Sequence, residues 1–263
     1  MLDFHNHMIP GVDDGSASLE ESLVALENMW EQGITHVITT PHFAASTVKQ
    51  RAEFESQMAH IDASWAVLMA AVRDHLPRMK LDRGVELALD DPNPVVTDPR
   101  LRLAGTRFAL VEFPDLTLPL NSVQPLLRLK VNGVTSIVAH PERYENLAPP
   151  FEILRAWKQA GAFLQLNAGS LVGAYGARVQ RNAWHCLESG LVDYISSDYH
   201  ARGTCLMAGA RERLVASGGI SQLRALTEYN GDRLVDGLDP TPVAPLERPK
   251  SRWGRLRKAL GWN

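Results

Sequence analysis

The sequence predicts an α/β fold, a distorted seven-stranded relative of the eightfold (β/α) barrel. Short β-rich apolar runs alternate with longer stretches of helical period, which is typical of parallel strands joined by crossover helices. Ionisable residues recur where the apolar runs end, and strand ends are where barrel enzymes hold their active sites. The chain has 263 residues, 45% of them hydrophobic, which suits a single barrel domain with a substantial core.

Seven apolar runs have the length and composition of buried strands. The first begins at the second residue of the chain and leads directly into two histidines. We expect the strands at Leu2–His5, Ile34–Thr39, Leu81–Glu86, Phe108–Glu112, Val134–His140, Ala162–Asn167 and Asp193–Ser197.

Between these runs, apolar residues recur three or four positions apart, as they do on one face of a helix. The first helix is the best defined. A capping box at Ser18–Glu21 begins it, and Gly33 stands where a helix C-cap belongs. Further helices are expected at residues 50–76, 122–131, 151–159, 178–188 and 208–215.

We expect one domain over residues 1–237, because no internal repeat or boundary precedes Gly237. Residues 238–263 form a Pro-rich linker followed by the basic segment Lys250–Asn263. This segment has two interpretations: a short interfacial helix that makes weak contact with an anionic membrane surface, or a solvated extension. We favour the extension, because one short helix anchors weakly.

Composition excludes several classes of protein. The formal net charge of −3 gives no overall attraction for nucleic acid, and the predicted barrel carries no basic stripe. Cys186 and Cys205 have no neighbour at zinc-finger spacing and fit a reducing compartment. No secretory or membrane-spanning stretch is found at the amino terminus. We therefore expect a cytoplasmic protein, placed at the inner membrane face if the basic segment binds lipid.

His5-Asn6-His7 is the first candidate for metal binding. On an extended segment, residues two positions apart point to the same face, so both imidazoles are able to bind one ion. The glycines of the following loop, Pro10–Gly15, allow a tight path that turns a carboxylate, Asp13 or Asp14, back toward the histidines.

Other candidates stand at the ends of later apolar runs. A glutamate in such a place needs a cation or a hydrogen-bond network. Each residue alone fits a satisfied core position, but five imidazoles and four carboxylates at one end of a barrel predict a metal centre. The candidate ligands are His5, His7, Asp14, His42, Glu86, Glu112, His140, Asp198 and His200.

Nitrogen and oxygen donors without thiolates favour manganese, with iron or catalytic zinc as alternatives. Nine ligands exceed the needs of one ion and fit two or three. Three divalent ions would leave the pocket positive, so it would attract an anion. Arg143, close after His140, adds a guanidinium fork that suits phosphate oxygens. Without the metals, a surface salt bridge with Glu142 or Glu145 would be the simpler interpretation.

The order of these motifs resembles the PHP (polymerase and histidinol phosphatase) superfamily. More narrowly, it resembles the CpsB/CapC-like manganese-dependent tyrosine-protein phosphatases of bacterial capsule and exopolysaccharide operons. The resemblance spans roughly the first 235 residues. It rests on His5–His7, Pro10–Gly15, Thr40–His42, Glu86, Glu112–Phe113, His140–Tyr144, Gln165–Leu171 and Ser197–His200.

The resemblance implies a distorted (β/α)7 TIM-like barrel of the PHP type with a trinuclear site. The three ions would be held by three sets of residues: His5, His7, Glu86 and Asp198; Glu86, Glu112 and His140; and Asp14, His42 and His200. Arg143 falls where the family places a phosphate-binding arginine. Phe43–Ser46 depart from the family, since many relatives carry further His, Arg or Asn residues there.

The implied function is a metal-dependent phosphatase that hydrolyses phosphotyrosine with a metal-activated water, without a phosphoenzyme. The implied partner is a bacterial polysaccharide-synthesis tyrosine kinase with a tyrosine-rich tail. Asp13 is a candidate general acid, and a metal-bound water is the alternative. The oligomeric state is left open by the sequence.

Alternatives are another PHP phosphoesterase, such as a histidinol-phosphate phosphatase, and a non-catalytic metal-bound docking module. A third signal is the Cys-x5-Arg spacing of cysteine-dependent phosphatases, which Cys205 and Arg211 share. We interpret that spacing as a coincidence, because the intervening residues are helix-compatible and no histidine or strand precedes them.

Overall fold

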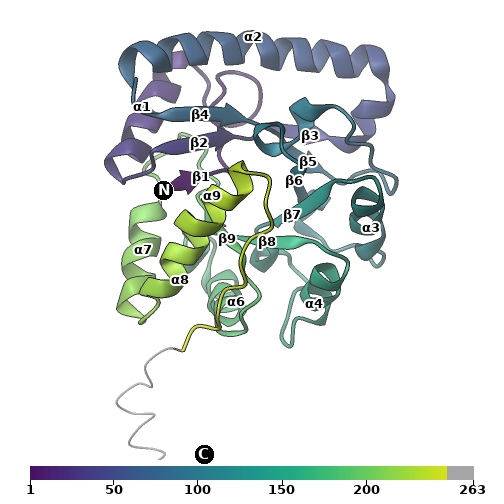
Figure 1. The fold of residues 1–263 in the computed structure, drawn as a ribbon, viewed down its shortest axis with the longest axis vertical. Helices are drawn as coiled ribbons and strands as arrows, with labels where there is room; N and C mark the ends of the chain where they lie inside the picture. The colour runs from purple at the N-terminus through teal and green to yellow at the C-terminus, as the bar shows by residue number, and fades with distance from the viewer. Residues whose placement is uncertain (248–263) are drawn as a thin grey trace, which may run out of the picture.

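The computed structural model describes residues 1–247, so the predicted basic segment Lys250–Asn263 lies outside the described residues. Strands lie in the middle of the molecule, and helices surround them (Figure 1). Every strand pair is parallel. The predicted α/β architecture with parallel strands is confirmed.

The strands form two sheets. The three-stranded sheet has the order β1 (Leu2–Asp3), β2 (His36–Thr39), β4 (Lys80–Arg83). The six-stranded sheet has the order β3 (His42–Ala44), β5 (Glu86–Ala88), β6 (Phe108–Glu112), β7 (Thr135–Ala139), β8 (Phe163–Asn167), β9 (Tyr194–Ser196). All seven predicted strands are found. The sequence did not predict β3 and β5 as separate strands.

Backbone hydrogen bonds link the two sheets at both of their edges. On one side, β2 and β4 lead into β3 and β5, and the amides of Gly84 and Glu86 donate across the junction, each over 2.9 Å. On the other side, the segment after β9 pairs with the segment after β1. There the Asp198 amide donates over 2.7 Å and the His7 amide over 2.9 Å. Residues that follow β1 and β9 are therefore held side by side.

Six predicted helices are present, with shifted bounds: α1 (Leu19–Glu31), α2 (Arg51–His75), α3 (Val123–Val131), α4 (Glu152–Gln159), α6 (Ala177–Glu188) and α7 (Met207–Ala216). The capping box of α1 is confirmed, because Ser18 accepts from the Glu21 amide. Short elements escaped prediction, since they span too few turns to show a period. These are α5 (Ala168–Val172), α8 (Ile220–Arg224), α9 (Asn230–Val235) and the π-helical η6 (Ala225–Tyr229).

The interior divides into an apolar part and a polar part. Leu2, Ile38, Leu110 and Ile137 belong to one buried apolar cluster, to which strands of both sheets contribute. The polar part lies at the strand ends, where side chains such as Glu86 are fully buried. Apolar packing thus fixes the strands, and the fixed strands position the polar groups.

Residues 239–247 lie against the body of the protein. Asn230 is fully buried and makes four hydrogen bonds of 2.9–3.1 Å, three of them with Thr241 and one with the Asp193 carbonyl. Leu246 is buried as well, and its amide donates to Leu187. The domain boundary near Gly237 stays a prediction. Within the described residues, no helix has the length and apolar character that crossing a membrane requires.

We expect Asn230→Ala to lower the free energy of unfolding by about 2–3 kcal/mol, because buried partners lose their hydrogen bonds. Urea denaturation followed by circular dichroism measures the change. Asn132→Ala, at an exposed position after α3, is the matched control and should change stability by less than about 0.5 kcal/mol. Equal effects of the two substitutions would contradict the role of Asn230 as the anchor of residues 239–247.

Candidate metal centre

The nine predicted ligands lie together. Most of them end a strand or follow one, whereas His42 and Glu86 stand at the start of a strand. Two short connections in the chain place the middle members of the set, because His42 begins β3 and Glu86 begins β5. These two residues are register partners in the six-stranded sheet. Since all strands run in parallel, side chains from distant parts of the sequence meet at one end of the fold.

The first group consists of His5, His7, Glu86 and Asp198, all of them buried. The Nε2 atom of His5 lies 3.1 Å from a Glu86 oxygen and 3.3 Å from an Asp198 oxygen. The Nε2 atom of His7 lies 3.5 Å from the same two oxygens. Two imidazole nitrogens and two carboxylate oxygens therefore face one small volume, as the ligands of a single cation do.

Hydrogen bonds on the far side of both rings fix their orientation. His5 Nδ1 lies 2.9 Å from the Gln165 side-chain oxygen, and His7 Nδ1 lies 2.6 Å from a carboxylate oxygen of Asp13. An acceptor at Nδ1 places the proton of the neutral ring there and leaves the lone pair on Nε2, which faces the group. Gln165 and Asp13 thus prepare the two rings to act as ligands.

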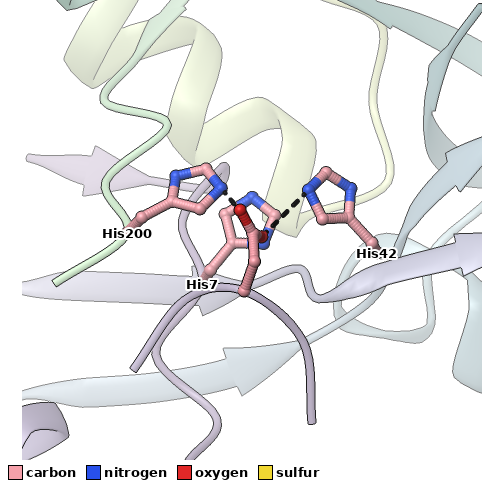
Figure 2. A group of neighbouring side chains, drawn as sticks. His7, His42 and His200 are labelled. Carbon is pink, nitrogen blue, oxygen red and sulfur yellow. Dashed lines mark ion pairs between the residues drawn. The ribbon is translucent and has the colours of Figure 1, made fainter. Parts of the chain in front are cut away.

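A second group consists of His7, Asp14, His42 and His200. Figure 2 shows the rings of His7, His42 and His200 turned toward one another. One oxygen of Asp14 lies 3.4 Å from Nε2 of His42 and 3.4 Å from Nε2 of His200. The rings of His7 and His200 stack with their centroids 3.9 Å apart. Two protonated rings would repel each other at this separation, so the arrangement suits neutral imidazoles that share a cation.

A third group consists of His42, Glu86 and Glu112. Nδ1 of His42 lies 3.1 Å from a Glu86 oxygen and 3.6 Å from a Glu112 oxygen. His140, which the resemblance placed with these glutamates, lies beside them. Its Nε2 is 3.0 Å from Glu86 and 3.8 Å from Glu112. The structure therefore adds His42 to the predicted set around Glu86 and Glu112.

The pKa values of His5 and Glu86 show that the three groups stabilise positive charge. Burial lowers the pKa of His5, but the carboxylates of Glu86 and Asp198 outweigh it and raise that pKa to about 9. Burial raises the pKa of Glu86, yet the imidazoles around it, His5 foremost, bring the pKa well below its usual range. Carboxylates that stay ionised in a buried pocket need cations close by.

Buried polar atoms that lack a hydrogen-bond partner show whether the side chains of these groups suit metal ions. His5 Nε2, His7 Nε2, Glu86 Oε2 and His140 Nδ1 are shielded from solvent and have no hydrogen-bond partner among residues 1–247. Leaving such groups unpaired is costly. Three of these atoms belong to the first group, and all are of the kind that bind divalent ions. The residues present therefore fit divalent cations.

Arg143 lies at the edge of this cluster, within the short turn η5 (Pro141–Arg143) that follows β7. It donates to Asp198 over 2.5 Å, and its guanidinium stacks on the ring of Tyr175, 4.4 Å from the centroid. Glu142, the salt-bridge partner considered from the sequence, is instead fully buried and accepts hydrogen bonds from Ser170 and the Asn167 amide. Arg143 is thus directed toward the candidate metal centre.

Asp13, the candidate general acid, has both oxygens engaged. One binds His7 and accepts from the His42 amide over 3.1 Å, and the other accepts from the Gly15 amide over 3.0 Å. Burial raises the pKa of Asp13, but the hydrogen bond and charge of His7, together with the Gly15 and His42 amides, outweigh it and lower the pKa below its usual value. An ionised carboxylate has no proton to donate, so these contacts favour a positioning role over an acid role.

The loop after His7 depends on a close approach. A side-chain carbon at Gly15 would lie 2.3 Å from the His7 carbonyl oxygen, closer than any real contact. Only glycine allows the loop to fold back here, as the sequence suggested. This fold brings Asp13 and Asp14 to the histidines.

Sequence reasoning gave no role to several contributors, although Gln165 and Asn167 lie in a segment on which the family resemblance rests. Gln165 and Asn167 are two positions apart in β8, so both side chains lie on its inner face. Asn167 donates a hydrogen bond to Asp198 over 2.8 Å. Two amides at a spacing of two in an otherwise apolar strand were the available signal. Tyr175, from the turn after α5, had no such signal. The remaining histidines lie outside the three groups: His36, His60, His75 and His185.

The Cys-x5-Arg spacing has no matching site. Cys205 is buried, and burial raises the pKa of its thiol to about 12. Arg211 donates to the Gln32 carbonyl instead of facing an anion pocket. A thiol that stays protonated is a poor nucleophile, which agrees with the interpretation of this spacing as a coincidence.

Comparisons with known proteins point in one direction. A family model described as capsular polysaccharide synthesis, CpsB/CapC, matches residues 1–235. The chain is 26% identical over 202 residues to the tyrosine-protein phosphatase YwqE of Bacillus subtilis (strain 168), covering 76% of this chain and 77% of YwqE. It is 27% identical over 209 residues to the tyrosine-protein phosphatase CpsB of Streptococcus agalactiae serotype III (strain NEM316), covering 76% and 83%.

The fold also has a match among solved structures. It aligns with one of the crystal structures of YwqE from Bacillus subtilis and CpsB from Streptococcus pneumoniae, which are metal-dependent tyrosine phosphatases. The TM-score is 0.77 at 23% sequence identity, and the alignment covers 94% of this chain and all of the other. This likeness supports the α/β fold with parallel strands.

We expect Gln165→Ala to weaken Mn²⁺ binding about 10–100-fold, because His5 loses the acceptor that fixes its ring. Isothermal titration calorimetry on the metal-stripped protein measures the affinity. Gln57→Ala, at an exposed position of α2, serves as the control and should leave the affinity unchanged. If the two variants bind Mn²⁺ equally well, the bond between Gln165 and His5 has no part in preparing the ligand.

Proposed function

Because the chain belongs to the CpsB/CapC family of capsular polysaccharide synthesis proteins, we propose that it is a metal-dependent protein-tyrosine phosphatase. Its curated relatives YwqE and CpsB are tyrosine-protein phosphatases. The observation that carries the proposal is the convergence of imidazoles and carboxylates into three groups that share His7, His42 and Glu86. Shared ligands are what a site for several neighbouring divalent ions requires.

The proposed ions are two or three Mn²⁺, with iron or zinc as alternatives. The first group would hold one, and the group of His7, Asp14, His42 and His200 another. Glu86, Glu112 and His42, with His140 beside them, would hold a third. When bound, such ions supply Lewis acidity, which lowers the pKa of water and neutralises phosphoryl oxygens.

The chain's own residues would bind and orient the substrate. Within residues 1–247, Arg143 uses one N–H group on Asp198, which leaves its other donors to bind phosphoryl oxygens where charge develops. Asp13 and Gln165 hold the histidine rings, so the pocket is ordered before substrate arrives. A phenolate leaving group, with a pKa of about 10, depends little on a general acid. Phosphotyrosine therefore suits a site in which Asp13 is ionised.

We also propose that the two sheets close into the predicted seven-stranded barrel of the PHP type. In this arrangement β2 with β3, and β4 with β5, each count as one strand. The backbone hydrogen bonds at both junctions and the parallel bridge between Asn6 and Tyr199 support it. Closure would place all ligands around one rim.

The proposed partner is a bacterial tyrosine kinase of polysaccharide synthesis that carries phosphotyrosine, and the proposed location is the cytoplasm, where such a tail would lie. Membership in a capsular polysaccharide synthesis family supports this partner class.

A substrate panel tests the proposal. With Mn²⁺ present, we expect the protein to hydrolyse a phosphotyrosyl peptide at least about tenfold more efficiently than a phosphoseryl peptide or histidinol phosphate. His5→Ala should lower kcat by about a thousandfold, because an ion of the first group loses a ligand. Preference for histidinol phosphate would favour the alternative PHP phosphoesterase. Absence of turnover on every substrate would favour a docking module.

Chelation of metal ions should abolish the activity, whereas alkylation of cysteines should leave it unchanged. We expect EDTA to abolish hydrolysis of p-nitrophenyl phosphate and Mn²⁺ to restore it, because the chemistry depends on bound ions. Iodoacetamide should leave the rate unchanged, since Cys186 and Cys205 are both buried. Activity that survives EDTA but is lost on alkylation would refute the metal-dependent reaction.

A further inference from the structure

A cavity of about 400 Å³ opens beside the candidate metal centre. Part of its lining, here called the polar end, includes the side chains of Asp14, Asp198, His200 and Arg143, which belong to the candidate metal centre or contact it. Its volume lies in the range of small-molecule binding sites. Under the proposed function, this end would receive the phosphoryl group, since it holds candidate ligands and a guanidinium. The rest of the cavity would then receive whatever the phosphoryl group is attached to.

Two large side chains with apolar surface, Tyr175 and Leu206, line the same cavity. Tyr175 and Leu206 are each 37% exposed, although side chains of this kind are usually covered in a folded protein. Both lie close to Gly169 in α5. A side-chain carbon at Gly169 would lie 2.9 Å from the Tyr175 ring and 3.2 Å from a methyl group of Leu206. The two side chains therefore adjoin over this glycine and form one surface.

Tyr175 is held in place by polar contacts. Asn167 donates to its hydroxyl over 3.2 Å, and the guanidinium of Arg143 stacks on its ring. Asn167 and Arg143 both donate to Asp198 as well. The ring is thereby fixed relative to the polar end of the cavity, so little rotamer freedom would be lost when a ligand binds.

We propose that Tyr175 and Leu206 form a wall that binds the aromatic ring of the substrate and selects aryl over alkyl phosphate monoesters. This inference rests on the proposed function and deepens it. An aromatic ring placed against a tyrosine ring and a leucine buries apolar surface on both. A seryl side chain is shorter and has no ring, so it would gain little from this wall. Selection thus comes from the ring, and the anion is bound by the polar end.

Binding of two phosphonates to the Mn²⁺-loaded full chain tests the wall without relying on turnover. Phenylphosphonate and methylphosphonate share the anion and differ in the ring. We expect the parent to bind phenylphosphonate about tenfold more tightly in calorimetry. Leu206→Ala should reduce this preference to below about threefold and change methylphosphonate affinity by less than about twofold. Tyr175→Phe keeps the ring and should keep the preference.

Leu127→Ala is the matched control, because Leu127 is 40% exposed on α3 and does not line the cavity. It should behave as the parent does. If Leu206→Ala kept the preference for phenylphosphonate, or lost affinity equally for both phosphonates, the proposed role of the wall in selecting the ring would be refuted. Failure of the proposed function is a separate result: the parent would prefer phenylphosphonate yet show no Mn²⁺-dependent hydrolysis of phosphotyrosyl peptides.

Discussion

The buried carboxylate of Glu86 is the constraint on which the site depends. Its oxygens lie 3.0–3.5 Å from nitrogen atoms of four imidazoles, those of His5, His7, His42 and His140, and its side chain has no exposed surface. A carboxylate in such a place is stable only with positive charge around it. The cluster therefore requires protons or cations, and the unpartnered nitrogen atoms that face the carboxylate suit cations.

The strands explain how this cluster is held. Apolar side chains from both sheets pack together, which leaves the strand ends to carry polar groups. Gln165 and Asp13 then fix the histidine rings from behind, at a distance from the ions they would serve. Metal binding, phosphoryl binding and ring selection would thus occupy successive parts of one continuous pocket. Arg143 connects them, because it contacts both Asp198 and Tyr175.

Prediction from the sequence succeeded where the signal is local or repeated. The alternation of strands and helices and the capping box of α1 follow from periods and termini. Most of the ionisable candidates end or follow a strand, as expected, but Glu86 begins β5 instead of ending a strand. The order of the motifs also indicated the family, which the match over residues 1–235 confirms. The breaks that separate β2 from β3 and β4 from β5 were missed, because strand pairing across a junction is not a property of either segment alone.

By itself, the sequence determined which residues stand at strand ends and which chemistry they carry, because these are properties of residue type and period. Only the tertiary structure decided how they combine. It brought His42 to Glu86 and Glu112, engaged both oxygens of Asp13, and placed Tyr175 under Arg143. Distances between side chains from different strands depend on register, loop paths and packing. None of these is encoded at a fixed spacing along the chain.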